Sequence, residues 1–208
     1  MPWRSPSEAE WKSIVASTPP ADTGQSIYIL RTSLSLSGIT GFDPETVPSA
    51  LREICTLGDP VHIVGTTVNR GNLKTATISN ERDVLIGMHV DSWDLLEPEY
   101  RQLARNRVSV NIGVSARHFM FLPLPVDGIA AAMADEPGPE EDVLDVTSLG
   151  RRFMRRFPDI PIVRCTIMPG EAYVAPTENL VHDGSTEGNP VESRHFTLVG
   201  HIMPTGHP

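Results

Sequence analysis

Proline and glycine occur so often along this chain that few long helices are expected. The sequence has 19 prolines and 16 glycines among 208 residues, placed between short runs of apolar and β-branched residues. Proline lacks the backbone N–H that helix interiors and central strands need, and glycine favours turns. Many short strands joined by turns are typical of sandwiches and barrels, so the pattern favours a β-rich fold.

The individual runs predict about eight strands, with helices before and between them. Strands are expected at 26–34, 61–68, 73–79, 83–90, 108–124 (broken at Gly113), 162–167, 172–174 and 194–202. Helices are expected at 8–16, 43–57, 128–134 and 146–157, and a helix or loop at 97–105. We therefore predict a mainly β fold, a double-stranded β-helix (jelly roll) with flanking helices, formed by residues 1–208 as a single domain.

The charge of the chain narrows the range of partners. The net charge is −9, which argues against binding to nucleic acid or to anionic membranes, since both require a basic surface. A cluster of four arginines within 151–156 has helical spacing and follows an acidic run, so it is interpreted as a solvated helix face. A small-molecule partner is therefore expected, and the sequence gives no oligomeric state.

Cysteine use and the first residues indicate a compartment. Cys55 and Cys165 are far apart and lie in apolar contexts, so both are expected to be buried thiols. Residues 1–20 are polar and lack the apolar core of a signal peptide, and no stretch approaches the length of a transmembrane helix. A cytoplasmic, reducing location is expected.

Three residues offer ligand atoms for one metal ion: His89, Asp91 and His182. Residues i and i+2 of a strand point to the same face, so His89 and Asp91 could reach one ion from a strand end. Two imidazoles and one carboxylate suit non-haem Fe(II) and leave positions open for substrate and O2. His182 is the preferred distant ligand because it follows the turn at 169–171. The other histidines are His62, His118, His195, His201 and His207.

Arginine residues offer a partner for an organic acid. Arg194 follows His182 after a turn-rich stretch, and a guanidinium can hold the carboxylate of a 2-oxo acid through two parallel hydrogen bonds. Arg117, in the long β-like run, is the alternative for this role, or it could bind a carboxylate of the substrate. If Arg194 has no such role, it is an exposed arginine of the last strand.

On these residues the chain resembles the Fe(II)/2-oxoglutarate-dependent oxygenase superfamily. The matching residues are His89-Val90-Asp91, the Pro169-Gly170-Glu171 turn before His182, and Arg194. The resemblance covers about Asp83 to Ile202 and is not seen in the first 80 residues. It implies a jelly-roll core, Fe(II) held by His89, Asp91 and His182, and the 2-oxoglutarate C5 carboxylate held by Arg194.

The resemblance also implies a reaction. O2 and 2-oxoglutarate would be consumed, succinate and CO2 released, and a small molecule hydroxylated, such as an amino acid or an intermediate of specialised metabolism. Related halogenases have a small residue where this chain has Asp91, so hydroxylation is expected rather than halogenation. Desaturation or ring closure would use the same ligands.

Four further residues are candidates for binding. Asn111 lies on the polar face of a strand and could line the 2-oxoglutarate site. Arg117, Trp93 and Glu178 are candidate substrate contacts, the last for a cationic group. Two other functions stay open: a cupin-type metalloenzyme that does not use 2-oxoglutarate, and a jelly-roll binding protein without catalytic activity. Substitution of Arg194 would separate the first from the oxygenase.

Overall fold

Two antiparallel sheets form the centre of the computed structural model, which describes residues 3–14, 26–34, 44–79, 84–135 and 146–205. The larger sheet has five strands in the order β1-β8-β5-β10-β2. Their bounds are β1 Tyr28–Arg31, β8 Glu171–Ala175, β5 Asn106–Asn111, β10 Ser193–Pro204 and β2 Cys55–Asn69. The smaller sheet has the order β7-β6-β9, with β7 Val163–Ile167, β6 Arg117–Pro125 and β9 Leu180–Ser185. A short pair consists of β3 Ile78–Ser79 and β4 Val84–Leu85.

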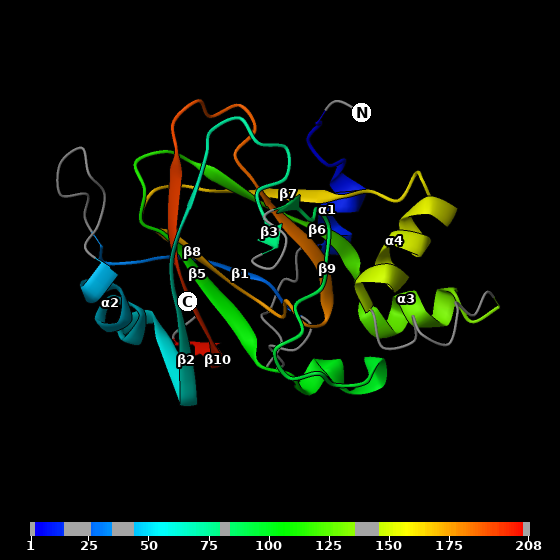
Figure 1. Ribbon diagram of the computed structural model, residues 1–208, viewed down its shortest axis with the longest axis horizontal. Coiled ribbons are helices and arrows are strands. Elements are labelled where there is room, and N and C mark those ends of the chain that lie inside the picture. Colours follow the sequence, from blue (N-terminus) through cyan, green and yellow to red (C-terminus); the bar gives the residue numbers. More distant parts are fainter. Residues whose placement is uncertain (1–2, 15–25, 35–43, 80–83, 136–145, 206–208) are drawn as a thin grey trace.

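The chain crosses between the two sheets repeatedly in its second half (Figure 1). After β5 it enters the smaller sheet for β6 and β7, returns to the larger sheet for β8, and alternates again for β9 and β10. Neighbouring strands are antiparallel throughout. This alternation is the double-stranded β-helix, so the predicted mainly β jelly roll is confirmed.

The larger sheet has an apolar outer face and a polar inner face. The outer side chains Val108 and Val110 of β5 and Phe196 and Leu198 of β10 join the first hydrophobic core with Leu51 of α2 (Val47–Ile54). Side chains of a strand alternate between the two faces, so the residues between these point the other way, towards the smaller sheet. The polar groups of β5 and β10 thus come to lie inside the jelly roll.

Two helices cover the smaller sheet. α3 (Val126–Ala132) and α4 (Val146–Arg156) pack Ile129 and Phe153 against Leu122 of β6 and Val181 of β9. Gly150 of α4 allows a close approach, because a Cβ atom there would lie 2.7 Å from Cγ2 of Val181. The helix therefore supports β9 from outside. Both helices were predicted, as was α1 (Glu8–Ile14).

The structure differs from the sequence prediction around 43–79. The helix expected to Leu57 is the 3-10 turn η3 (Pro44–Thr46) followed by α2, and it ends at Ile54. Cys55 already belongs to β2, which pairs with β10 as far as Pro204. Long-range pairing here overrides the local helical pattern. Residue 43 lies outside the described residues.

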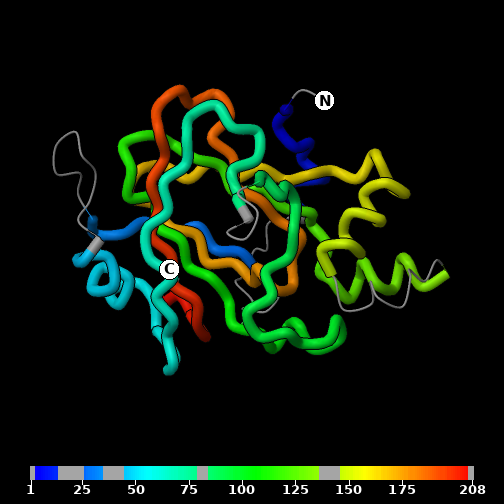
Figure 2. The backbone as a smooth tube through the Cα atoms, in the orientation of Figure 1, coloured from blue at the N-terminus to red at the C-terminus, as the bar shows by residue number. Residues whose placement is uncertain are grey.

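The strands expected at 61–68 and 73–79 do not pair with each other. β2 pairs with β10 instead, and residues 70–77 run alongside the connection from β9 to β10, as Figure 2 shows near the top of the view. Asn72 N donates to Thr186 O at 3.2 Å, and Ala76 N donates to Gly184 O at 2.8 Å. Residues 97–105 contain the 3-10 helix η4 (Pro98–Leu103).

Both cysteines are free thiols, Cys55 buried and Cys165 partly buried. Within the described ranges, no helix has the length and apolar character needed to cross a membrane.

Candidate metal centre

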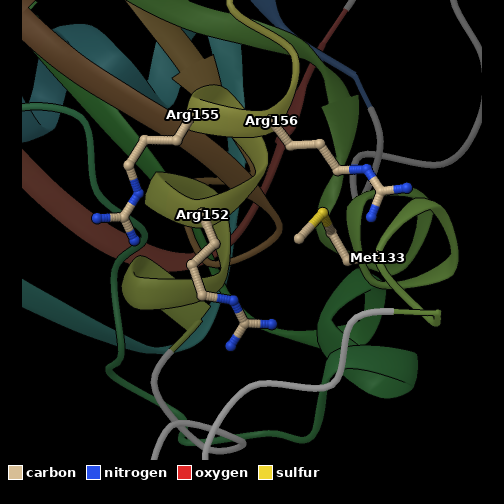
Figure 3. Close-up of a pocket in the computed structure, with 4 residues that line it drawn as sticks. All are labelled: Met133, Arg152, Arg155 and Arg156. Atoms are coloured by element: carbon tan, nitrogen blue, oxygen red, sulfur yellow. The ribbon is translucent and has the colours of Figure 1, made fainter.

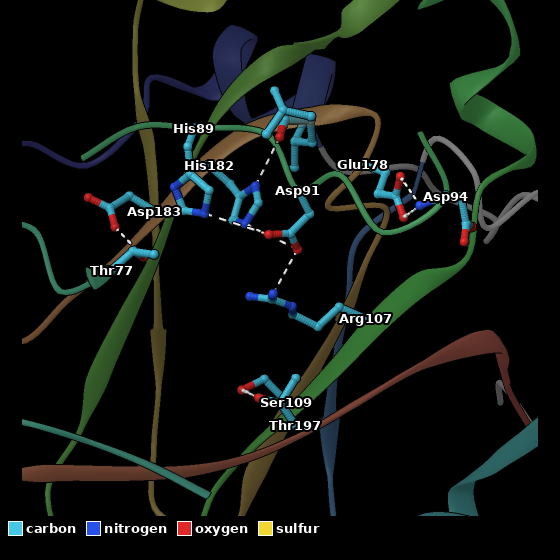
Figure 4. Close-up of polar contacts among 12 residues, drawn as sticks. Thr77, His89, Asp91, Asp94, Arg107, Ser109, Glu178, His182, Asp183 and Thr197 are labelled. Atoms are coloured by element: carbon cyan, nitrogen blue, oxygen red, sulfur yellow. Dashed lines mark hydrogen bonds and ion pairs between the residues drawn. The ribbon is translucent and has the colours of Figure 1, made fainter. Parts of the chain in front are cut away.

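Three side chains from two segments meet inside the jelly roll. Each of them, His89, Asp91 and His182, offers one ligand atom, and these three atoms lie within 4.8 Å of one another. All three residues are buried. His182 lies in the middle of β9, and the other two lie in the segment after β4. The structure thus brings together the three residues that the sequence singled out for a metal ion (Figure 4).

Backbone pairing explains why the two segments meet. His89 and His182 form an isolated antiparallel bridge, with N–O distances of 2.9 and 2.8 Å in the two directions. Asp91 N then donates to Thr177 O at 3.0 Å. Residues 89–91 therefore add a short extended piece beside β9, although the strand expected over 83–90 is limited to β4 among the described residues.

The hydrogen bonds of the two imidazoles fix which nitrogen can bind a metal. Nδ1 of His89 lies 2.8 Å from Gly87 O, and Nδ1 of His182 lies 2.9 Å from Leu180 O. A carbonyl oxygen only accepts, so each Nδ1 must be the protonated donor and each Nε2 carries the free lone pair. Nε2 of His182 has no hydrogen-bond partner among the described residues.

The electrostatics keep His182 and Asp91 in their metal-binding forms. Burial, helped by the neighbouring His89, lowers the pKa of His182 to about 3. Burial alone would raise the pKa of Asp91, but Arg107 and the two histidines outweigh it and hold that pKa below its ordinary value. A neutral imidazole and an ionised carboxylate at neutral pH are what a divalent cation requires. The donor set therefore fits a metal ion, and Fe(II) suits it.

Arg107 of β5 faces this centre from the larger sheet. Its Nη2 lies 2.8 Å from Oδ2 of Asp91, and its side chain is 18% exposed. Ser109, two residues on, shares this inner face and lies 3.4 Å from the hydroxyl of Thr197 on β10. Figure 4 shows Arg107 and Ser109 following one another along β5 below the triad.

A second buried guanidinium lies further along the interior. Arg117 of β6 is 5% exposed, and its Nε and Nη1 atoms have no hydrogen-bond partner in the described part of the chain. Its Nη2 lies 2.9 Å from the place where a Cβ atom of residue 184 would be, so Gly184 makes room for it. His195 Nδ1 also lacks a described partner. Burial, together with Arg117 and Arg107, lowers the pKa of His195 well below its ordinary value.

Aromatic rings fill the space between the two inner faces. Phe119 of β6 stacks on Tyr173 of β8 with ring centroids 4.2 Å apart, and it lies 5.7 Å from the ring of His182. Both aromatic residues are buried. The metal centre is thus surrounded by apolar rings on one side and by guanidinium groups on the other, a low-dielectric setting in which a charge–charge contact is strong.

Arg194 is not brought to this centre. Its side chain is about half exposed, and its Nε and Nη2 donate to Oε1 of Glu192 at 2.8 and 2.6 Å. Arg194 has the strand parity of Phe196, whose side chain belongs to the outer face. The structure therefore places Arg194, the expected clamp, away from the triad, whereas the alternative, Arg117, is buried.

Asn111 also has a role different from the expected one. Its Nδ2 donates to Ser115 O and Ile167 O, both at 2.9 Å, and its Oδ1 accepts from Gly113 N at 3.1 Å. These bonds fasten the turn between β5 and β6 to the end of β7. Both N–H groups of the Asn111 amide are thus used within the protein.

Glu178 is fully buried and bonded within the protein. Its carboxylate accepts from Asp94 N at 3.0 and 3.1 Å, and burial raises its pKa to about 7. Arg101 Nη1 donates to the carbonyl oxygens of Asp91 and Glu178 at 3.1 and 2.9 Å. The expected contact with a cationic substrate is thus replaced by a role in holding the segment that carries Asp91.

Trp93 lies at the surface beside that segment. It is 40% exposed, and its ring lies 5.7 Å from the ring of His62 on β2. Its position, two residues after Asp91, keeps it a candidate for substrate contact.

The sequence interpretation did not identify Arg107, Arg101 or a role for His195. A signal existed for Arg107, since the alternation of Ser109 and Asn111 with apolar residues extends back to it. No comparable pattern marks Arg101, because its carbonyl partners are far away in the sequence.

A separate hollow lies between α3 and α4. Figure 3 shows it lined by Met133, Arg152, Arg155 and Arg156. Its three arginines belong to the basic cluster predicted as a solvated helix face, and both helices lie on the outer side of the smaller sheet.

Comparison with known proteins gives matches among solved structures only. Neither a protein-family model nor a curated protein matches the chain. Structures of the Kdo hydroxylase KdoO, described as a non-heme Fe(II) alphaketoglutarate dependent dioxygenase, are among them. Its complex with succinate and Fe(III) is 12% identical with a TM-score of 0.48, covering 86% of this chain and 80% of that chain. The complex with alphaketoglutarate and Fe(III) is 14% identical with a TM-score of 0.46.

The apo structure is likewise 14% identical with a TM-score of 0.46, and it covers 69% of this chain and 54% of that chain. In that alignment this chain spans about half the length of the other.

Proposed function

We propose that this chain is an Fe(II)- and 2-oxoglutarate-dependent dioxygenase that hydroxylates a small molecule. The observation that carries the proposal is a buried two-histidine, one-aspartate ligand set next to buried guanidinium nitrogens that have no described partner. Such a ligand set leaves open positions for an oxo acid and O2. Fe(II) would supply the activation of O2 that no side chain can provide.

Arg117 is the residue that would hold the C5 carboxylate of 2-oxoglutarate. A buried guanidinium with unused N–H groups incurs a free-energy cost that an anion removes. Arg117 lies over Gly184, which is two residues from His182 on the same face of β9. That separation is roughly 6–7 Å along a strand. A short dicarboxylate could therefore contact Arg117 at one end. Its other end could reach the metal positions that the three protein ligands leave open.

The residues around the metal position would orient its ligands, exclude water and contact the substrate. Backbone carbonyls hold both imidazoles with Nε2 towards the metal position. Phe119 and Tyr173 exclude water from the interior and so strengthen charge–charge contacts there. Trp93, exposed beside Asp91, is the side chain that we propose contacts the small-molecule substrate.

The proposal is tested by anaerobic titration with Fe(II) and then 2-oxoglutarate. Chelation of the 2-oxo acid should produce a weak visible charge-transfer band. Arg117→Met should raise the apparent Kd for 2-oxoglutarate more than about 100-fold, because two charge-assisted hydrogen bonds are lost. Arg194→Met is the matched control, since Arg194 pairs with Glu192 at the surface, and it should leave the Kd unchanged.

Turnover gives a second measurement. Succinate should form only when Fe(II), 2-oxoglutarate and O2 are all present, and a panel of small carboxylic acids and amino acids should contain a compound that increases it. Fe(II) binding without a band, together with an unaffected Arg117→Met variant, would contradict the proposal and favour a metalloenzyme that does not use 2-oxoglutarate.

A further inference from the structure

Arg107 makes an ion pair with one oxygen of the metal ligand Asp91. Nη2 of Arg107 lies 2.8 Å from Oδ2. The contact is not a hydrogen bond, since Oδ2 has no hydrogen-bond partner among the described residues, so the N–H groups are not aimed along the N–O line. Charge attraction does not need that alignment. Oδ2 therefore has a mostly buried cation at contact distance.

The two oxygens of Asp91 consequently have different surroundings. Oδ1 lies 3.6 Å from Nε2 of His89. Oδ2 lies 3.9 Å from Nε2 of His182, but it is closer to Arg107. An imidazole nitrogen can offer its lone pair to a metal ion, whereas the guanidinium is a fixed positive charge. A metal ion at the triad would meet this positive charge on the Oδ2 side.

The difference matters because a carboxylate can bind a metal with one oxygen or with both. Three protein atoms leave half of an octahedral shell open, which a chelating 2-oxo acid and O2 can fill. A chelating Asp91 would occupy one more position and leave too few. Arg107 both competes with the metal for Oδ2 and repels a cation that approaches that oxygen.

We propose that Arg107 is a positioning residue. Its ion pair with Oδ2 keeps this oxygen from binding the metal, so that Asp91 binds the metal through one oxygen only. The inference rests on the proposed metal centre, but not on the use of 2-oxoglutarate. Groups that contact a metal ligand commonly tune the metal in this way. The position of Arg107 in the sequence explains its direction, because it follows Asn106 and is the first residue of β5 that faces inward.

Mn(II) alone is the probe, and the readout is the number of water molecules bound to it. Line broadening of the Mn(II) electron paramagnetic resonance by 17O-labelled water counts them. Arg107→Met, which keeps an unbranched apolar stem but removes the charge, should bind Mn(II) with one water fewer than the wild-type protein. Its Mn(II) affinity should be equal or higher, because a repelling cation is gone. Arg107→Lys keeps the charge and should restore the wild-type water count.

Each opposing result is distinct. An unchanged water count in Arg107→Met, or a lower Mn(II) affinity as expected from a merely structural role, would overturn the inference. A crystal structure of the wild-type protein with Mn(II) is independent of how the variants fold, and two bonded Asp91 oxygens would also overturn it. A wild-type protein that does not bind Mn(II) at all would contradict the metal centre itself.

Discussion

His89 and His182, which both offer a ligand atom to the metal site, are also paired through their backbones. The N–O distances are 2.9 Å and 2.8 Å, and the pair is the bridge that joins the segment after β4 to β9. Since the bridge positions both imidazoles, the backbone pairing itself brings the ligand set together.

Metal binding should therefore stabilise the folded protein strongly. Co(II) at about 100 times its Kd is expected to raise the free energy of unfolding by about 2.7 kcal/mol, if it binds the unfolded chain weakly. His182→Ala removes a buried ligand and should abolish this gain, whereas His201→Ala, which changes an exposed histidine of β10, should preserve it. Urea unfolding with and without Co(II) measures both. Equal stabilisation of the two variants would contradict the site.

Arg101 should affect both stability and metal affinity although it touches no metal. Its Nη1 donates to the carbonyl oxygens of Asp91 and Glu178, and the residue is 3% exposed. Arg101→Met leaves both carbonyls without this donor and should lower the free energy of unfolding by about 2–3 kcal/mol. Metal affinity should fall about tenfold as Asp91 loses its support. Arg31→Met, at an exposed arginine, is the control, and a loss of the same size there would refute the explanation.

The metal ligands could be predicted because short sequence spacing or residue type alone marks them. His89 and Asp91 have the i, i+2 spacing that places both on one side of an extended segment, and His182 is the histidine of β9 that faces the interior. The bridge between His89 and His182 is not encoded by either segment alone. It follows from the packing of the segment after β4 beside β9.

The arginine that we propose binds the oxo acid could not be assigned from the sequence. Side chains alternate along a strand, but the sequence does not say which of the two faces points inward. Arg194 and His195 must face opposite sides of the larger sheet, but the sequence does not say which side α2 covers. In the structure Phe196 lies under α2, so Arg194 shares its outward direction and Arg117 becomes the interior guanidinium. The same applies to the predicted helix at 43–57, whose end is set by the pairing of β2 with β10.

Glu178 should make stability depend on pH in the direction opposite to an ion-paired carboxylate. Burial raises its pKa in the folded protein to about 7, from an ordinary value of 4.5. The folded state thus holds the proton more tightly. The stabilising contribution is complete below about pH 4.5 and is lost as the pH rises to about 7.

The measurement compares the wild-type protein with Glu178→Gln, whose amide oxygen can still accept from Asp94 N. The difference in unfolding free energy, wild type minus variant, should fall by on the order of 1–2 kcal/mol from pH 4.5 to pH 7 in metal-free buffer. A difference that is constant or that rises over this range would show that Glu178 is ionised in the folded protein throughout.

Gly184 should control the affinity for 2-oxoglutarate through the space it leaves for Arg117. A Cβ atom at this position would lie 2.9 Å from Nη2 of Arg117, closer than side-chain contacts normally allow. Gly184→Ala should therefore displace the guanidinium and raise the Kd for 2-oxoglutarate about tenfold, which corresponds to about 1.4 kcal/mol. The binding of Fe(II) alone should change little, since His182 and Asp91 do not contact this position, and it serves as the internal control. If the variant loses affinity for Fe(II) and for 2-oxoglutarate equally, the alanine acts by distorting β9. A selective loss of affinity for 2-oxoglutarate identifies Arg117 as the group that binds it.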